Sequence, residues 1–331
     1  MVSKGRMVAR VAAVVAASIV TVAVSAAQAE EWRGWNIHDP DYPVSAGMEA
    51  FGDKVRAATG GEIDPKTFHN AVLGNQPDAI EQVRVGAIDF AVFNMGPLGQ
   101  VVPAASVVSL PFIFKGMDHM HRVMVGPIGE EIGAHLAEKG LQPLAWYDSG
   151  ARSFYNTAKP IASPDDVKGM KIRVMNNDLF VKMIEAMGGN ATPMAFSEVY
   201  QSLKTGVIDG AENNWPSYES TNHYEVAGYY STSEHLIIPE CLCVNKKTWD
   251  SLSADTQAAV KQAARESADL QREAWAKRAE QSREQVLKAG VKFNEITDKS
   301  AFQNAMASVY ETFLTDHPDL RPLVEKIKAT D

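Results

Sequence analysis

The sequence predicts an α/β protein of two domains that are joined by hinge strands and bridged by one long helix. A unit of helix, glycine and strand occurs once in each half, at 78–94 and 199–214, which favours two similar domains over one barrel. Two strand-like runs meet at the short break Asp148-Ser149-Gly150, as expected of a strand that crosses between domains. Residues 253–289 lack proline and glycine and form one predicted helix of about 37 residues, too long for either domain alone.

The first 29 residues are predicted to be a signal peptide that is cleaved after Ala29. Lys4, Arg6 and Arg10 precede the apolar run 11–24, and Ala27-Gln28-Ala29 matches a small-x-small cleavage site. The apolar run is shorter than the ~20 residues of a spanning helix, although an uncleaved anchor stays an alternative. Cleavage of the signal peptide removes three positive charges and takes the formal net charge from -9 to -12. Because nucleic acid and anionic lipid are bound through excess Lys and Arg, we expect neither as a partner.

The predicted first domain comprises residues 30–149 and 240–274, and the second comprises 150–239 and 275–331. The first domain begins with a strand that ends at His38, a polar loop with Tyr42, and a helix that stops at Gly60-Gly61. In open α/β sheets ligands bind at the carboxyl ends of strands, so His38 and Tyr42 are candidate site residues.

The next predicted helix begins at Asn75 or Gln76, either of which suits its cap, and Pro77 suits its first turn. It ends at Gly86, and a buried strand follows and finishes at Asn94. Aligning Gly86 with Gly206 of the second unit places Asn94 on Asn214. Asn75, Gln76 and Asn94 are therefore further candidates at strand and helix ends.

Two arginines, Arg152 and Arg173, lie beside or inside apolar strand-like runs, and Asn213 closes another such run. A guanidinium keeps its charge when buried, so each arginine needs an anionic and preferably planar partner. That partner is either a protein carboxylate, such as Glu212 for Arg173, or a ligand carboxylate. The residues alone leave both alternatives open.

Aromatic residues follow the asparagine pair, and the chain then returns through a strand. The flat faces of Trp215 and Tyr218 suit a pyranose ring, although loop aromatics also serve as cover for a core. Residues 235–244 are predicted as one strand with Pro239-Glu240 in its middle. Its two thiols, Cys241 and Cys243, are predicted to be core residues, since an i,i+2 disulfide is strained and two thiols make no metal site.

Several stretches resemble the solute-binding proteins of tripartite ATP-independent periplasmic (TRAP) transporters: LGNQPDAIEQVRVGAIDFAVFN at 73–94, KGMKIRV at 168–174 and ATPMAFSEVYQSLKTGVIDGAEN at 191–213. The resemblance runs from about Trp35 to Gly290. It implies a periplasmic clamshell of two α/β domains, a long helix across the backs of both, and TRAP membrane permease subunits as partners. We expect a monomer without cofactor.

The resemblance also implies roles for individual residues. The arginine that pairs the ligand carboxylate falls on Arg173 in KIRV, and a second arginine falls on Arg152 in GAR. The supporting carboxamide falls on Asn213 in AEN, and the aromatic residue of MAFSEV is Phe196. Sialic-acid binders of this family have a glutamate after the strand at 87–93, whereas this chain has Asn94, which argues against sialic acid.

HDPDYP at 38–43 and NNWPSYES at 213–220 resemble the members that bind hexuronic acids, which implies D-glucuronate or D-galacturonate as ligand. The expected hydroxyl partners are Asn75, Gln76, Asn94, Asn213 and Glu240, and Trp215 or Tyr218 would cover the ring face. The sequence does not distinguish the two epimers.

Two functions remain for comparison. The first is a receptor that closes on a sugar acid and delivers it to a permease. The second is an exported enzyme, a lyase or isomerase, with arginine holding the carboxylate and His38 or a tyrosine as base. The chain lacks GxxxxGK[ST], GxGxxG, HExxH and GxSxG, so no phosphate loop, metal or nucleophile is indicated. Because nothing specifies a base, we predict a receptor and no enzyme.

Overall fold

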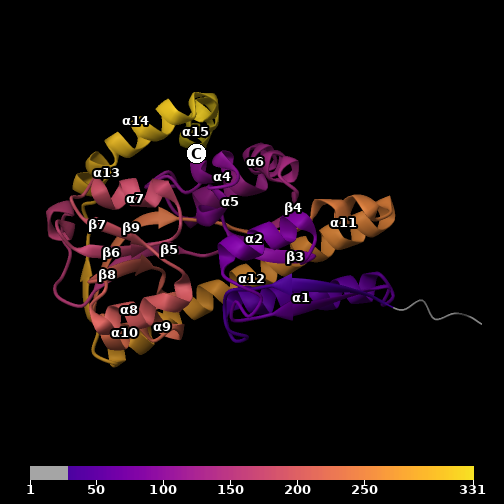
Figure 1. The fold of residues 1–331 in the computed structure, drawn as a ribbon, viewed down its shortest axis with the longest axis horizontal. Coiled ribbons are helices and arrows are strands. Elements are labelled where there is room, and N and C mark those ends of the chain that lie inside the picture. The colour runs from indigo at the N-terminus through magenta and orange to yellow at the C-terminus, as the bar shows by residue number, and fades with distance from the viewer. Residues whose placement is uncertain (1–28) are drawn as a thin grey trace, which may run out of the picture.

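The computed structural model describes residues 29–331, so the predicted signal peptide lies outside the described residues except for Ala29. The strands of this part of the chain form two sheets, one in each half of the molecule (Figure 1). Helices pack around both sheets. The predicted α/β fold class is therefore confirmed.

The first sheet has the strand order β2-β1-β3-β10-β4. Its strands are β1 (Glu30–Trp35), β2 (Ile63–Phe68), β3 (Phe90–Asn94), β4 (Leu141–Tyr147) and β10 (Glu240–Asn245). β1 pairs in parallel with β2 and β3, whereas β10 runs antiparallel between β3 and β4. The helices that follow these strands in the chain are α1 (Pro43–Ala58), α2 (Gln76–Val85), α3 (Met95–Leu98), α4 (Pro103–Val107), α5 (Met117–Val125), α6 (Pro127–Glu138) and α11 (Lys246–Ser251).

The second sheet has the order β11-β9-β5-β8-β6-β7. Its strands are β5 (Ala151–Asn156), β6 (Lys171–Val174), β7 (Asn190–Pro193), β8 (Gly210–Asn213), β9 (Tyr229–Ile237) and β11 (Lys292–Glu295). The α-helices of this half are α7 (Asp178–Glu185), α8 (Val199–Thr205), α9 (Trp215–Ser220), α10 (His223–Val226), α13 (Ser300–Ala305), α14 (Ala307–Asp316) and α15 (Arg321–Ala329), and three 3-10 turns accompany them, η1 (Pro164–Val167), η2 (Phe196–Glu198) and η3 (Pro318–Leu320). β6 is parallel to β7 and β8, and β5 is antiparallel to β8 and β9.

Two short connections carry the chain between the sheets. The first is Asp148–Gly150 between β4 and β5, as the sequence predicted. Gly150 has φ 62°, and a Cβ there would lie 2.9 Å from Nε1 of Trp275, so this position requires glycine. The second connection is Ile238–Pro239 between β9 and β10. The prediction of one strand at 235–244 is wrong at this point, because proline lacks the N–H that a strand ladder needs.

The long helix α12 (Ala254–Lys288, 35 residues) spans both halves, as predicted. The hydroxyl of Ser253 caps it by accepting the N–H of Thr256 at 3.1 Å. It packs on α1 and β4 in one half and on α9 in the other (Figure 1). Its Gln271 forms two hydrogen bonds of 2.9 Å to the backbone of Asp148. The helix therefore supports the first connection from behind.

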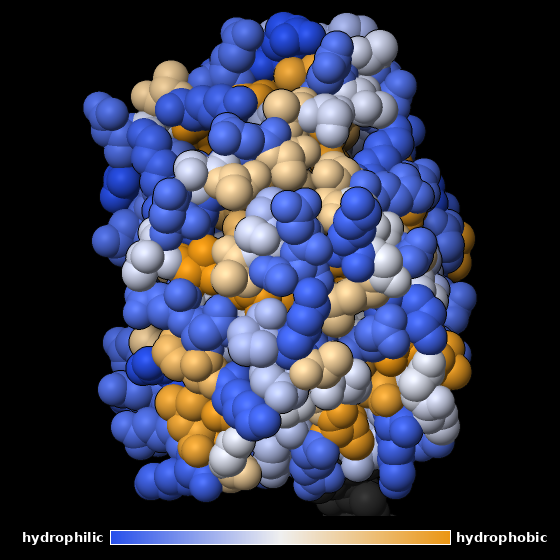
Figure 2. All heavy atoms as spheres, turned by 90° about the vertical axis from the view of Figure 1, so that its left-hand side faces the viewer, coloured by the Kyte–Doolittle hydropathy of each residue, from blue (hydrophilic) through white to orange (hydrophobic). Residues whose placement is uncertain are grey.

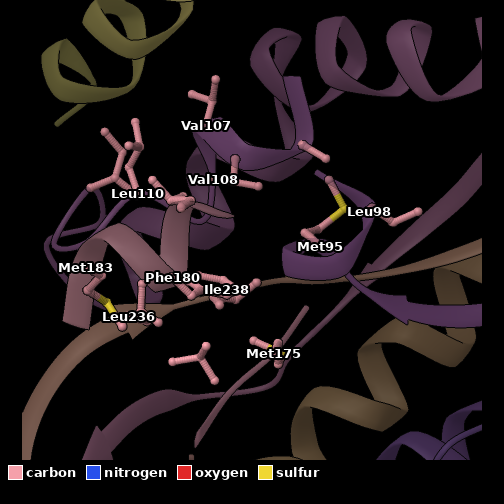
Figure 3. Close-up of a cluster of buried hydrophobic side chains, with 14 of the residues drawn as sticks. Met95, Leu98, Val107, Val108, Leu110, Met175, Phe180, Met183, Leu236 and Ile238 are labelled. Atoms are coloured by element: carbon pink, nitrogen blue, oxygen red, sulfur yellow. The ribbon is translucent and has the colours of Figure 1, made fainter. Parts of the chain in front are cut away.

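A continuous apolar core joins the two halves beside the connections. Figure 3 shows its central part, in which Met95, Leu98, Val107, Val108 and Leu110 of the first half approach Met175, Phe180, Met183, Leu236 and Ile238. The amide of Asn177 adds a hydrogen bond of 2.5 Å to the carbonyl of Gly96. The two halves are thus in contact on this side of the molecule.

The carboxyl-terminal helices cross from the second half to the first, along the upper edge of the view in Figure 1. α14 packs on α7, and α15 packs on α6. A ring nitrogen of His119 on α5 lies 3.1 Å from the carbonyl of Ile327 on α15. The segment 275–331 therefore contacts both halves. The domain boundaries predicted from the sequence remain a prediction.

The face of the molecule in Figure 2 is largely hydrophilic. On the face that Figure 2 shows, hydrophilic side chains surround apolar ones, which form small separate patches. Cys241 and Cys243 are buried and free, as the sequence predicted for core thiols. Within residues 29–331 no helix combines the length and the apolar character needed to cross a membrane.

Candidate functional site

A cavity lies between the two sheets, at the carboxyl ends of β3, β6 and β8. The predicted site residues that line it are His38, Asn75, Gln76, Asn94, Arg152, Arg173, Phe196, Asn213 and Glu240. The empty space around these residues, with the solvent at the mouth included, is about 670 Å³. Residues far apart in the chain thus converge on one cavity.

Arg173 is the cation that the protein leaves available in this cavity. It comes from β6, and its side chain is held by hydrogen bonds of 3.1 Å from Nε and 2.8 Å from Nη2 to the carbonyl of Met194. Its guanidinium carbon lies 5.9 Å from the centre of the Phe196 ring. Within residues 29–331 no carboxylate lies within 4.0 Å of it, and Nη1 donates no hydrogen bond.

Burial leaves Arg173 only 3% exposed and lowers its pKa to about 10, so the side chain remains charged at neutral pH. A buried cation without a protein carboxylate needs an anion from elsewhere. The structure does not contain the alternative ion pair between Arg173 and Glu212. Arg173 can therefore receive the carboxylate of a ligand.

Arg152, in contrast, is already paired. Its Nε and Nη2 donate to the two carboxylate oxygens of Glu212 at 2.6 and 2.8 Å, and Nη2 also donates to the Glu212 carbonyl at 2.8 Å. Nη1 donates to Oδ1 of Asn213 at 2.7 Å. Burial opposes the charge of Arg152, but Glu212 outweighs burial and raises the pKa of the arginine. Arg152 thus holds Asn213 in place and keeps one N–H of its Nη1 for a ligand.

The first half of the molecule contributes groups that are neutral or acidic. The amide of Asn94 donates to Glu240 at 3.4 Å while its oxygen accepts the N–H of Gly96 at 3.1 Å. Gln76 donates to the carbonyl of Asn94 at 2.8 Å, and Asn75 lies exposed at the mouth. Burial, and then the charge of Arg152, lowers the pKa of His38 to about 3, so this imidazole is neutral.

Glu240 lies at the start of β10, directly after the second connection. Its side chain is buried, and burial raises its pKa to about 7 against the opposing effects of Asn94, Ser149 and Arg152. A carboxyl group with this pKa can accept or donate a hydrogen bond near neutral pH.

Three predicted aromatic residues lie outside the cavity. Tyr42 stacks on His38 at 3.7 Å and shares a hydrogen bond of 2.8 Å with Ser217, so it supports the lining from behind. Trp215 stacks on Tyr230 at 3.6 Å, and Tyr218 is fully buried and donates to the carbonyl of Ala227 at 2.6 Å. The expected cover of a sugar ring by Trp215 or Tyr218 is corrected: both belong to the core of the second half, and Phe196 is the aromatic side chain beside Arg173.

Sequence reasoning missed several lining residues, among them Ser149, Met175, Asn176, Met194 and Ser217. Ser149 lies in the first connection, which was recognised as a hinge but not as a site. Asn176 is the second residue after β6, the strand that contains Arg173. A polar residue so close to the end of such a strand was the signal available in the sequence. Within residues 29–331 no group of His, Cys, Asp and Glu side chains has the arrangement of a metal site.

Comparisons with known proteins agree with this geometry. Residues 36–316 match the DctP family, described as bacterial extracellular solute-binding protein, family 7. A TRAP periplasmic solute-binding protein from Roseobacter denitrificans, solved with bound β-D-glucuronate, is 60% identical, with a TM-score of 0.90 and coverage of 91% of this chain and 100% of that one.

Two further relatives are similar over most of their length. A TRAP periplasmic solute-binding protein from Sulfitobacter sp. NAS-14.1, solved with bound β-D-galacturonate, is 60% identical, covers 90% of this chain and 99% of its own, and has a TM-score of 0.89. A solute-binding protein from Chromohalobacter salexigens is 58% identical over 318 residues, which are 96% of this chain and 95% of the relative. The chain therefore belongs to the DctP family, the solute-binding proteins of TRAP transporters.

Proposed function

We propose that this protein is the extracytoplasmic receptor of a TRAP transporter and that it captures a hexuronate, D-glucuronate or D-galacturonate, through its carboxylate. The observation that carries the proposal is Arg173, a buried arginine in a cavity that no protein carboxylate neutralises. The two relatives at 60% identity, solved with β-D-glucuronate and β-D-galacturonate, support this class of ligand.

The arrangement of the cavity suggests how such a ligand lies. Its carboxylate meets the free donors of Arg173, with Asn213 and the remaining N–H of Arg152 beside it. Phe196 covers one side of the ring. The hydroxyl groups face the first half, where Asn75, Gln76, Asn94 and Glu240 offer donors and acceptors.

We further propose that capture closes the two domains about the connections 148–150 and 238–239. Hinge motion is absorbed by a few residues at the ends of elements, which is where these connections lie. X-ray scattering with and without glucuronate tests closure, and a smaller radius of gyration is expected with ligand. Identical curves at saturation contradict closure about these connections.

The ionisation of His38 and Tyr42, the two bases considered from the sequence, argues against catalysis by either of them. His38 has a pKa near 3, and burial raises the pKa of Tyr42 well above its ordinary value. Neither is poised to take a proton at neutral pH. Incubation of the pure protein with either uronate should leave the sugar acid unchanged, and product formed at enzymatic rates contradicts the receptor.

We also propose how the protein is processed, where it resides and which partner receives its ligand. The mature protein begins at Glu30 after signal-peptide cleavage, resides in the periplasm as a monomer, and delivers its ligand to the TRAP membrane permease subunits. Mass spectrometry of the exported protein reads both its first residue and its oligomeric state. A mature chain that begins elsewhere contradicts only the proposed cleavage site, and a dimer contradicts only the proposed monomer.

A thermal-shift screen is the direct test of the ligand class. The screen contains uronic acids, aldonic acids, sialic acid and dicarboxylates. A ligand that binds only the native state stabilises it by about 4 kcal/mol at a thousandfold excess over Kd. We expect the largest shift with a hexuronate, and a shift confined to succinate-like dicarboxylates contradicts the proposal.

A further inference from the structure

Few of the side chains that line the cavity carry a charge. Among the described residues that line it, Arg152, Arg173 and Glu240 carry formal charge, and His38 is neutral. The charge of Arg152 is balanced by Glu212 behind it, through two hydrogen bonds between guanidinium and carboxylate. One cation, Arg173, and one carboxyl group, Glu240, therefore remain to face a ligand.

Arg173 and Glu240 come from opposite walls. Arg173 lies on β6 of the second sheet, whereas Glu240 opens β10 of the first sheet and pairs there with Asn94 and Tyr147. No positively charged group of residues 29–331 lies within 4.0 Å of the Glu240 carboxyl, so no salt bridge neutralises it. A ligand between the walls meets the cation at one end and this carboxyl group at the other.

The groups that face Glu240 come from every element packed around it. Asn94 donates to it from the end of β3, and Ser149 lies beside it in the first connection. Arg152 of β5 is the charged group that acts on Glu240, and the charges of both act on Tyr42, which directly precedes α1. None of these groups supplies a free positive charge, because Arg152 is paired with Glu212 and Tyr42 is protonated.

We propose that Glu240 limits this cavity to sugar acids with a single carboxylate, and that it takes up one proton when such a ligand enters. The inference rests on the proposed function. The ligand carboxylate balances Arg173, so an ionised Glu240 would be left as an uncompensated buried charge, which is costly in a closed site. A second ligand carboxylate would meet no cation even when Glu240 is protonated.

The protonated carboxyl group also suits a sugar. It offers one O–H donor and an acceptor oxygen, and hydroxyl groups use both. In the empty cavity burial already holds the pKa of Glu240 near 7. The negative charge of a bound ligand raises that pKa further, because a like charge disfavours ionisation. Proton uptake should therefore be nearly complete at pH 8.

Titration calorimetry with D-glucuronate from pH 6 to pH 8.5 tests the inference. Arg173 stays charged over this range. Wild type should lose affinity by up to about tenfold for each pH unit above 7. Repeating the titration at pH 8 in buffers of different ionisation enthalpy should count about one proton taken up per ligand bound.

Two variants complete the experiment. Glu240→Gln keeps the size of the side chain but cannot ionise, so its affinity should change less than twofold across the range, with no proton uptake. Glu219→Gln is the matched control, because Glu219 is a buried glutamate bonded to Arg278 and Gln285 away from the cavity. This control should keep the pH dependence of wild type.

Each outcome decides a separate point. Absence of proton uptake by wild type at pH 8 overturns the inference, and this reading stands even if Glu240→Gln fails to bind. Proton uptake that persists in Glu240→Gln overturns it as well. Tight binding of glucarate, the diacid, by wild type at pH 8 overturns the limit to one carboxylate. Absence of binding of both glucuronate and galacturonate at every pH instead refutes the proposed function.

Discussion

The two helix–glycine–strand units of the molecule have the same local geometry. α2 ends at Gly86 with φ 81°, and α8 ends at Gly206 with φ 73°. Directly before the strand that follows, the carboxylate of Asp89 accepts the N–H of Arg33, and that of Asp209 accepts the N–H of Lys171, both at 2.8 Å. The alignment of these units from sequence is thus matched in detail by the structure.

The units differ at their last residue. Asn94 and Asn214 both cap the next helix through their side-chain oxygens. The amide nitrogen of Asn94 faces the cavity and donates to Glu240, whereas that of Asn214 donates to the carbonyl of Ser149 at 2.8 Å. In the second unit the preceding residue, Asn213, lines the cavity instead. The same local pattern therefore contributes a different position to the site in each half.

The halves also differ in charge. The second half supplies both arginines of the cavity, and the first half supplies Glu240 with neutral amides. Under the proposed function, this asymmetry would orient an acidic ligand with its carboxylate toward the second half. Variants that separate the two arginines, the glutamate and the two units test this comparison.

The largest effect on stability is expected for Arg152→Ala. Removal of Arg152 leaves the fully buried Glu212 without its partner, and breaking a buried pair from one side costs about 3–5 kcal/mol. Urea denaturation without ligand measures the free energy of unfolding. Arg84→Ala removes an exposed pair with Glu81 and should cost less than about 1 kcal/mol. Equal losses in the two variants contradict a structural role for Arg152.

Arg173→Ala should have the opposite profile, with lost affinity and little change in melting temperature. Leaving a bound carboxylate buried and unpaired costs about 2–5 kcal/mol, or about thirtyfold to several thousandfold in Kd. Arg173→Lys should also bind poorly, because an ammonium group lacks the planar pair of donors. Lys171→Ala, on the exposed side of the same strand, should bind as wild type in calorimetry. Normal binding by Arg173→Ala together with a much lower melting temperature shows that Arg173 is structural.

Glu240→Gln should stabilise the ligand-free protein at alkaline pH. Because burial raises the pKa of Glu240 from 4.5 to about 7, the native state binds more protons than the unfolded state between these values. The contribution of Glu240 to stability therefore falls as pH rises from 4.5 to 7 and is then level, a loss of roughly 3 kcal/mol from this one group. Denaturation at pH 8 and pH 4.5 should show the variant more stable at pH 8 only. A difference that is independent of pH argues against this ionisation.

The smallest effects are expected for Asp89→Ala and Asp209→Ala. Each removes one carboxylate that accepts a backbone N–H at the same place in its unit, which should cost about 1 kcal/mol. Urea denaturation of both variants compares the units directly. A cost for one that exceeds the other by more than about 1 kcal/mol shows that the two units are not energetically equivalent.

The sequence by itself determined the elements and their order. The helix predicted at 253–289 is observed at 254–288, and both glycine stops and the crossing at 148–150 are found where predicted. These features depend on contacts within a few residues, such as periodicity, capping and left-handed glycine, so a single chain displays them. Arg173 was recognised for the same reason, as a charge inside an apolar strand.

Only the tertiary structure decided which side chains share the cavity. Glu212 pairs with Arg152 across 60 residues, which leaves Arg173 available, and Trp215 and Tyr218 turn into the core around Tyr230. The position of Glu240 depends on β10, which returns between β3 and β4. This return places the Glu240 carboxyl group beside Asn94 and without a neighbouring cation. Such contacts join residues distant in the chain, and their energies depend on burial that no local pattern displays.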